Sequence, residues 1–157
     1  MSEEDPSTSS FDVLSKRLED ALEKKPDEPM ANGFLNDIYD DFIDIVRRPS
    51  TAIIEFYTHS CPYCRQIAPI LDDLASDYKS KVYFAKINIE EVKSAAEAFD
   101  VEGVPLVIAF KKGQPVGRME GLRSHGQLDE WINNVYKGFR PMSPESGPVT
   151  RITIDNL

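Results

Sequence analysis

The stretch of sequence that decides the fold is AIIEFYTHSCPYCRQIAPIL, residues 52–71. Its first six residues form a nearly continuous run of apolar and β-branched side chains, a pattern typical of a strand that is covered on both faces. From Cys61 to about Tyr78 the apolar residues recur at helical spacing, and Pro69 is expected to kink this helix because it removes a backbone hydrogen bond. The sequence therefore predicts a buried strand that leads through a short turn into a helix.

Two cysteines stand at the predicted start of that helix. The nucleophile in thiol–disulfide exchange is a thiolate, and the unpaired N–H groups of a helix start stabilise an anion such as Cys61 would carry. Pro62 suits the first helical position because it has no N–H to leave unpaired. The spacing places Cys64 within disulfide reach of Cys61, so it can resolve a mixed disulfide. Cys61 is the candidate nucleophile and Cys64 the candidate resolving cysteine.

The same two cysteines could instead be half of a zinc site or an inert pair in the core. A tetrahedral zinc site needs four ligands, whereas the chain has two cysteines and two histidines. His125 is distant in sequence, and His59 is too near to give a usual ligand spacing. Redox use is favoured, with no metal and no cofactor other than the reversible Cys61–Cys64 disulfide.

Periodic apolar patterns continue on both sides of the cysteine pair. They predict helices over residues 11–22, 34–46, 91–99 and 124–136, and strands over residues 82–89, 106–110 and 116–120. The resulting order, two helices followed by β-α-β-α-β-β-α, predicts an α/β fold in which helices cover both faces of a sheet. In addition, the β-branched residues in 149–154 could add an edge strand.

Composition limits the classes of function. The 157 residues are 41% hydrophobic, which suffices for one packed core. The formal net charge of −9 does not favour nucleic acid as a partner. No apolar run approaches the ~20 residues that span a bilayer, and the first thirty residues are too charged for a signal peptide. We therefore expect a cytoplasmic monomer without a membrane partner.

The negative charge is concentrated in the first fifty residues, which suggests a division of the chain. We expect a disordered N-terminus over residues 1–10, where Ser, Thr, Glu, Asp and Pro dominate. An acidic helical extension over 11–33 then precedes the main domain, 34–138. A C-terminal tail, 139–157, carries the potential edge strand.

An ordered set of motifs lies between Ala52 and Gly138. They are Phe56, Cys61-Pro62-Tyr63-Cys64, Ile67-Ala68-Pro69-Ile70-Leu71, Ala85-Lys86-Ile87-Asn88, Gly103-Val104-Pro105, Phe110-Lys111-Lys112-Gly113, Gly121 and Gly126-Gln127-Leu128. In this order and spacing the chain resembles the thioredoxin family. The resemblance implies a thioredoxin fold, in which helices flank both faces of a central mixed sheet of four to five strands, and here an N-terminal helical extension would precede it.

The resemblance also implies roles for four residues outside the cysteine motif. Pro105 would follow a cis peptide bond and face the cysteines, and the backbone of Val104 would pair with an extended substrate segment. Glu55 stands where the family has a buried aspartate that moves protons to and from the resolving cysteine, and Lys86 matches the partner of that aspartate. Without the resemblance, a lone X-Pro bond is more often trans, and a carboxylate in a buried strand needs a counter-ion or a raised pKa.

The chain also departs from the thioredoxin pattern. Ser60 replaces the family's tryptophan, Leu106 replaces a threonine in the floor of the substrate groove, and Pro62-Tyr63 replaces Gly-Pro. Cys-Pro-Tyr-Cys is similar to glutaredoxins, but the chain lacks their Thr-Val-Pro and downstream Gly-Gly, so glutathione binding is not favoured. His59 could stabilise a thiolate when protonated, although a single loop histidine is more often an exposed bystander. The candidate substrate contacts are Ser60, Pro62, Tyr63, Val104 and Gly121.

Three hypotheses for function follow. The first is a protein-disulfide reductase that acts on disulfide-containing proteins and is recharged by a donor of the thioredoxin-reductase type. The second is a glutathione-linked or an oxidising or isomerising dithiol protein, because Pro62-Tyr63 differs from the usual reductase pair. The third is a binding module whose cysteines carry a metal or an iron–sulfur cluster.

Overall fold

The structure, a computed structural model, describes residues 13–15, 17–18, 27–138 and 152–153. Its helices are α2 (Phe42–Arg47), α3 (Pro62–Asp77), α4 (Lys93–Ala98) and α5 (His125–Lys137). Its strands are β1 (Leu35–Asp37), β2 (Thr51–Tyr57), β3 (Tyr83–Asn88), β4 (Gly103–Val104), β5 (Leu106–Lys111), β6 (Gln114–Glu120) and β7 (Ile152–Thr153).

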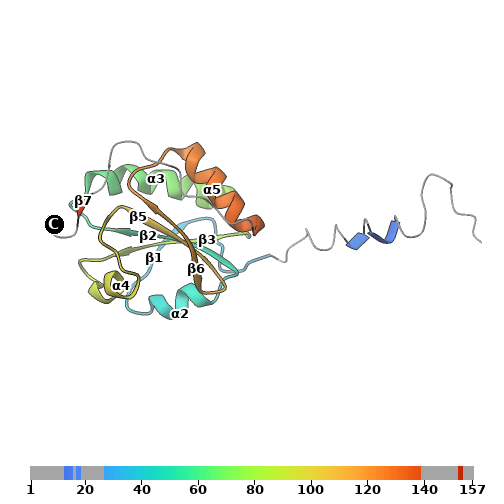
Figure 1. Ribbon diagram of the computed structural model, residues 1–157, viewed down its shortest axis with the longest axis horizontal. Coiled ribbons are helices and arrows are strands. Elements are labelled where there is room, and N and C mark those ends of the chain that lie inside the picture. Colours follow the sequence, from blue (N-terminus) through green and yellow to red (C-terminus); the bar gives the residue numbers. More distant parts are fainter. Residues whose placement is uncertain (1–12, 16, 19–26, 139–151, 154–157) are drawn as a thin grey trace, which may run out of the picture.

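Five of the strands form one mixed sheet in the order β1-β3-β2-β5-β6. Strand β3 pairs in parallel with both β1 and β2, β5 is antiparallel to β2, and β6 is antiparallel to β5. Helices α3 and α5 cover one face of the sheet, and α2 and α4 cover the other (Figure 1). The α/β fold with helices on both faces, predicted from the sequence, is confirmed.

The central strand β2 is buried on both faces, as its apolar run predicts. Ile53 packs with α3 and α5 in one cluster, whereas its neighbour Ile54 packs with α2 and α4 in the other. This alternation follows from the two-residue repeat of a strand, whose successive side chains point to opposite faces. All residues of β2 up to Phe56 are buried, which places Glu55 inside the fold.

The predicted helix over residues 34–46 is wrong in its first half. Residues Leu35–Asp37 form strand β1 at the edge of the sheet, and only Phe42–Arg47 is helical. The apolar spacing fits a helix locally, but contacts with the sheet outweigh that pattern. Leu35 pairs with Phe84 of β3, and the side-chain Nδ2 of Asn36 donates to the Phe84 carbonyl at 3.0 Å. The sheet therefore gains a fifth strand that the element order from the sequence did not contain.

Apart from β4, which was not predicted, the other elements inside residues 27–138 agree with the prediction to within a few residues at their ends. Of the predicted helix over 11–22, the structure describes 13–15 and 17–18, which are helical. The predicted disordered segment 1–10 lies outside the described residues, as do 139–151 and 154–157 of the predicted tail. Ile152 and Thr153 form a strand, but they pair with β4 in a separate two-stranded sheet and do not extend the main one.

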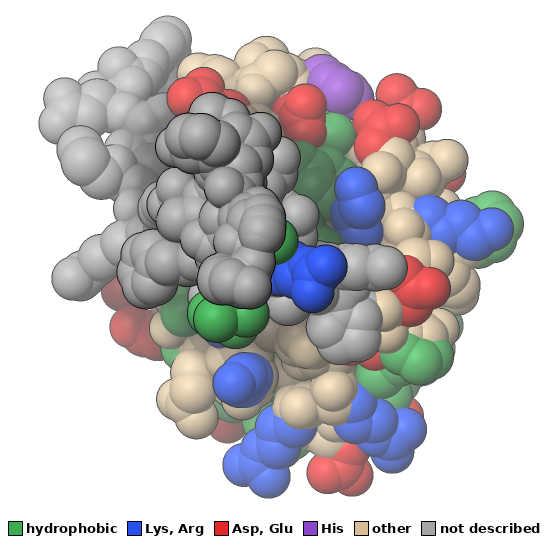
Figure 2. Space-filling view, turned by 90° about the vertical axis from the view of Figure 1, so that its right-hand side faces the viewer, with side chains coloured by type: hydrophobic (Ala, Val, Ile, Leu, Met, Phe, Trp, Pro, Cys, Tyr) green, Lys and Arg blue, Asp and Glu red, His purple; other side chains and the backbone are tan. Residues whose placement is uncertain are grey.

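The segment that precedes β1 is hydrogen bonded to the domain. Glu28 donates its N–H to the Ser80 carbonyl at 2.8 Å, and Ser80 donates to Ala31 at 2.8 Å. The carboxylate of Glu28 also accepts from the Ser50 N–H at 3.1 Å. This is the end of the domain from which the N-terminal part of the chain departs, and the side chains visible there are of mixed charge (Figure 2).

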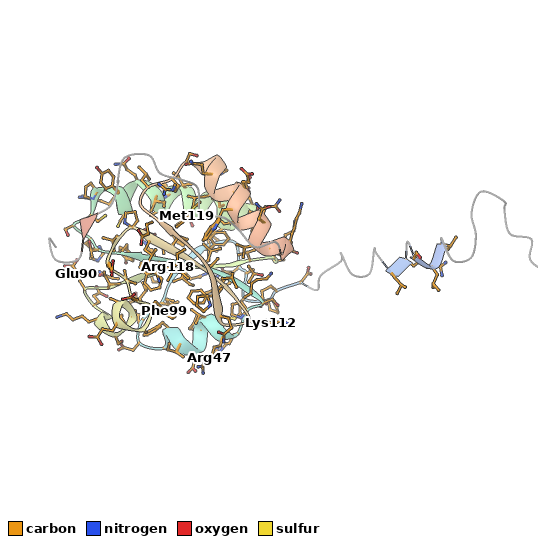
Figure 3. The ribbon with its side chains drawn as sticks, viewed as in Figure 1. Arg47, Glu90, Phe99, Lys112, Arg118 and Met119 are labelled. Atoms are coloured by element: carbon orange, nitrogen blue, oxygen red, sulfur yellow. The ribbon has the colours of Figure 1, made fainter. Side chains whose placement is uncertain are left out.

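The loop between α4 and β4 is fixed from the sheet. Arg118 of β6 lies next to Phe99 (Figure 3) and donates to the carbonyls of Phe99 at 2.6 Å and Asp100 at 2.9 Å. Asp100 has a positive φ of 53°, a backbone conformation that aspartate tolerates better than most residues. These contacts hold in place the chain that enters Gly103 and Val104.

No helix in the described part of the chain has the length and apolar character needed to cross a membrane.

Candidate active site

Cys61 is the N-cap residue of α3. Its backbone is extended, Pro62 occupies the first turn, and the Cys61 sulfur accepts a hydrogen bond from the Cys64 N–H at 3.1 Å. The predicted stabilisation of the sulfur by helix-start amides therefore has a specific donor. An anionic sulfur would be held more strongly than a thiol, because hydrogen bonds to charged acceptors are stronger than neutral ones.

Cys64 lies one turn further along, and both cysteines are free thiols, as in the reduced state. Burial raises the pKa of the Cys64 thiol far above its ordinary value, and its hydrogen bond with Cys61 raises that pKa further. A thiol with a raised pKa stays protonated and is a poor attacking group in the resting state. The geometry therefore favours Cys61 as the nucleophile and Cys64 as the resolving cysteine.

Both thiols of the pair are inaccessible in this structure. A reacting thiolate should be accessible, but the exposed fraction of Cys61 is 0% and that of Cys64 is 2%. Both residues belong to the same buried cluster as Phe56 and Val104. In this conformation a protein disulfide has no access to the sulfur of Cys61.

Glu55 is buried in β2, the strand that precedes the cysteine pair. Its exposed fraction is 1%, and neither carboxylate oxygen has a hydrogen-bond partner among the described residues. Burial raises the pKa of Glu55 to about 8, although the positive charge of Lys86 lowers it. A negative charge on Glu55 also contributes to the raised pKa of Cys64, so the two groups are close enough to influence each other's protonation.

Lys86 stands directly beside Glu55 in the register of β2 and β3. Its ammonium group, however, lies 4.0 Å from the carboxylate of Asp37 and 5.2 Å from the centre of the Tyr57 ring. Lys86 therefore affects Glu55 through its charge and reaches toward the surface, where Asp37 is half exposed. This geometry explains why Glu55 keeps a raised pKa despite a lysine next to it.

The Val104–Pro105 bond is cis, as the resemblance to thioredoxins implies. Val104 and both cysteines lie in one cluster, and the Pro105 carbonyl accepts from the Gly121 N–H at 2.8 Å. Gly121 has a positive φ of 83°, which favours glycine at this turn. Val104 is thus brought together with the cysteines, Gly121 is bonded to the neighbouring Pro105, and all three residues are buried.

The remaining candidate contacts lie on the outer side of the site. Ser60 and Pro62 are exposed and Tyr63 is half buried, so these residues form a rim next to the covered thiols. His59 is exposed as well, with its Nε2 atom 3.9 Å from the Glu91 carboxylate and its ring edge-on to Tyr57. The histidine thus faces the carboxylate of Glu91 at the edge of the site.

The sequence indicated a strand in the C-terminal tail but not that this strand pairs with β4. Ile152 pairs with Val104 and Thr153 with Gly103 in antiparallel register. The β-branched residues of 149–154 did indicate a strand, but no local signal identifies the partner of a strand so distant in sequence. In the part of the chain that the structure describes, no group of three or more His, Cys, Asp or Glu side chains converges as metal ligands would.

The family model described as Thioredoxin matches residues 35–134 of the chain. Among curated proteins, a thioredoxin from Staphylococcus aureus is 36% identical over 81 residues, which make up 52% of this chain and 78% of the bacterial protein. The same protein is found in several strains of that species.

Two solved structures are similar in fold. A point mutant of a thioredoxin from Halobacterium salinarum has a TM-score of 0.61 and 24% identity, over 71% of this chain and 96% of its own. A chain from a study of thiol resolution in yeast mitochondrial 1-Cys peroxiredoxin has a TM-score of 0.59 and 22% identity, over 64% of this chain and 94% of its own. At these identities the two structures support the fold alone.

Proposed function

The chain belongs to the thioredoxin family of thiol–disulfide oxidoreductases, and from this premise we propose that it reduces disulfides in other proteins through Cys61 and Cys64. The observation that carries the proposal is the difference between the two thiols. The Cys61 sulfur receives an amide N–H from the helix start, whereas burial raises the pKa of Cys64. The Cys61 sulfur is therefore suited to attack a substrate disulfide, and the Cys64 thiol stays protonated until the mixed disulfide has formed.

The reaction balances over two exchanges. The Cys61 thiolate attacks one sulfur of a substrate disulfide, forms a mixed disulfide and releases the other substrate sulfur as a thiolate, which takes up a proton. Cys64 then loses its proton and attacks the Cys61 sulfur. The Cys61–Cys64 bond forms, the mixed disulfide breaks, and the second substrate thiol leaves. Two electrons have passed to the substrate, and a dithiol donor of the thioredoxin-reductase type restores the reduced pair.

Glu55 is the proposed acceptor for the Cys64 proton. Its pKa of about 8 lets a minor but useful fraction of the carboxyl ionise at neutral pH. Val104 is the proposed docking strand for an extended substrate, with Pro105 and Gly121 fixing its position through their hydrogen bond. Ser60, Pro62 and Tyr63 would contact the substrate from the rim, and Lys86 would tune the pKa of Glu55.

Reduction of insulin disulfides, followed by turbidity with dithiothreitol as the donor, tests the proposal. Cys61→Ser should abolish turnover, and Lys79→Ala, a change at an exposed residue of the same domain, should leave it intact. Cys64→Ser should trap a mixed disulfide through Cys61, visible as a mass adduct that dithiothreitol releases. Turnover that survives Cys61→Ser would eliminate the proposed reaction.

The direction of the exchange is set by the midpoint potential of the Cys61–Cys64 couple. The midpoint potential of a reductase should be about −270 mV, and that of a strong oxidant about −120 mV. Titration against dithiol buffers therefore separates the proposed reductase from an oxidising or isomerising protein with the same cysteines. Turnover with glutathione as the donor would instead support the glutathione-linked alternative. Iron and zinc analysis of protein purified without air tests the metal-carrying alternative.

A further inference from the structure

Strand β4 is the proposed docking strand for substrate, and in this structure it already has a partner. Gly103 and Val104 pair with Thr153 and Ile152 of β7, in antiparallel register. Strand addition uses the backbone N–H and C=O groups of an exposed edge, so an edge that is paired with one strand cannot accept another. The C-terminal strand and a substrate segment therefore compete for the same backbone.

The backbone that β7 pairs with and the nucleophile beside it are both buried. Gly103, Val104 and Pro105 are buried, and so is Cys61, which lies in the same cluster as Val104. Ser60 and Pro62, which lie in sequence on either side of Cys61, remain exposed. Figure 1 places β7 at the end of the molecule where α3 begins, which is the end that carries the cysteine pair.

The C-terminal segment can occupy the site but cannot react there. The only cysteines of the chain are Cys61 and Cys64, so residues 139–157 contain no sulfur that could form a mixed disulfide with Cys61. The β-branched residues of 149–154 favour the extended conformation that strand addition requires. Because the segment is part of the same chain, its binding is intramolecular, at an effective concentration set by the connecting residues.

From these observations we infer that the C-terminal strand Ile152–Thr153 is a built-in competitor of substrate, which covers Cys61 until a disulfide-containing segment displaces it from Gly103–Val104. The inference rests on the proposed function for the role of β4, and it adds regulation of that site. A chain in this covered state protects its nucleophile from alkylation and oxidation. Substrates must compete with the chain's own strand for β4, which lowers their apparent affinity.

The test uses the full-length chain and disrupts the pairing through the backbone. Successive residues of an antiparallel strand alternate in their bonding to the partner, so the double variant Ile152→Pro/Thr153→Pro removes whichever N–H takes part. The matched control is Ser143→Pro/Ser146→Pro, which adds two prolines to the same tail outside β7. The thermal unfolding midpoint reports whether the domain of either variant remains folded.

The first readout is the rate at which iodoacetamide alkylates Cys61, measured in a Cys64→Ser background so that one thiol reacts. If β7 is paired in nine of ten molecules, the competent fraction is one tenth, and releasing the strand should speed alkylation about tenfold. The control should react at the rate of the unmodified chain. A rate within twofold of the unmodified chain for the Ile152→Pro/Thr153→Pro variant overturns the inference.

The second readout is insulin reduction by chains with both cysteines. If β7 competes with substrate, its release in the Ile152→Pro/Thr153→Pro variant should lower the KM about tenfold and leave kcat unchanged. If β7 had a purely structural role, the same variant would instead have a lower kcat and a lower unfolding midpoint. That result would overturn the inference. Alkylation of the full chain should not depend on protein concentration, and a rate that rises on dilution would show that the strand comes from a second copy.

The two proposals can fail separately. If the proline variant is alkylated faster but neither it nor the parent chain reduces insulin, the reductase activity is refuted and the covering strand is retained. Equal alkylation in variant and parent, with normal insulin turnover, would refute the covering strand and retain the reductase.

Discussion

The variant Glu55→Gln tests whether the buried carboxyl of Glu55 titrates differently in the folded and unfolded states or is only a buried polar group. The glutamine side chain has nearly the same shape but does not ionise, so it removes the pH dependence that the carboxyl contributes. In the folded state the pKa of Glu55 is about 8, compared with 4.5 for an unperturbed glutamate. The folded state therefore holds this proton over a range of pH in which the unfolded chain has released it.

The sign of the effect follows from that difference. Below pH 4.5 the carboxyl is protonated in both states and costs nothing. As the pH rises toward 8, the unfolded state is stabilised by ionisation while the folded state is not, so the free energy of unfolding falls. Each pH unit in this range is worth ~1.4 kcal/mol. Between pH 5 and 7 the wild-type chain should lose about 2.5 kcal/mol through this one group.

Urea unfolding of the reduced protein at pH 5, 6 and 7 measures this slope. Glu55→Gln should carry a constant offset, because its buried amide also lacks partners, but it should lack the loss of about 2.5 kcal/mol. Glu130→Gln, the same change at an exposed residue of α5, should follow the wild-type slope. Parallel slopes for wild type and Glu55→Gln would refute the argument, since Glu55 would then ionise alike in both states.

Two further substitutions test the packing of the domain. Ser124→Ala should lower the free energy of unfolding by about 1 kcal/mol, because the Ser124 hydroxyl accepts from the Gln127 N–H at 3.2 Å and the Gln127 side chain accepts from the Ser124 N–H at 3.0 Å; an unchanged urea midpoint would contradict the cap. Phe110→Ala should cost about 3–5 kcal/mol in the same assay, because the ring is fully buried and packs edge-on against Phe99. Val116→Ala, at a partly exposed position, should stay within about 0.5 kcal/mol, and an equal loss in both variants would argue against a core role for Phe110.

The cysteine site could be predicted because its signals are local. A buried strand, a short turn and Pro62 after Cys61 define a helix start, and the structure places Cys61 at the N-cap with the expected amide donor. Glu55 could also be singled out, since a carboxylate within an apolar run must be paired or carry a raised pKa. The resemblance to thioredoxins added the cis bond before Pro105, which an isolated X-Pro would not have suggested.

The features that could not be predicted depend on contacts between distant residues. Leu35 belongs to a strand because β3 offers it a backbone partner and Asp72 accepts its N–H at 3.1 Å. Strand β4 has only two residues, too few for any periodic pattern, and its partner β7 is distant from it in sequence. The burial of Cys61 likewise appears only when the whole site is assembled.

The hydrogen bond between Glu28 and Ser80 fixes the start of the domain at the end opposite the cysteine pair. Cys61 caps the start of α3 and Ser80 follows its end, and a helix of 16 residues is about 24 Å long at ~1.5 Å per residue. A fusion partner, a surface linker or a binding protein attached ahead of Glu28 would thus meet the domain at the pole opposite the sulfur chemistry (Figure 1). Immobilisation through the segment ahead of Glu28 should accordingly leave the end of the domain that carries the cysteine pair directed away from the support.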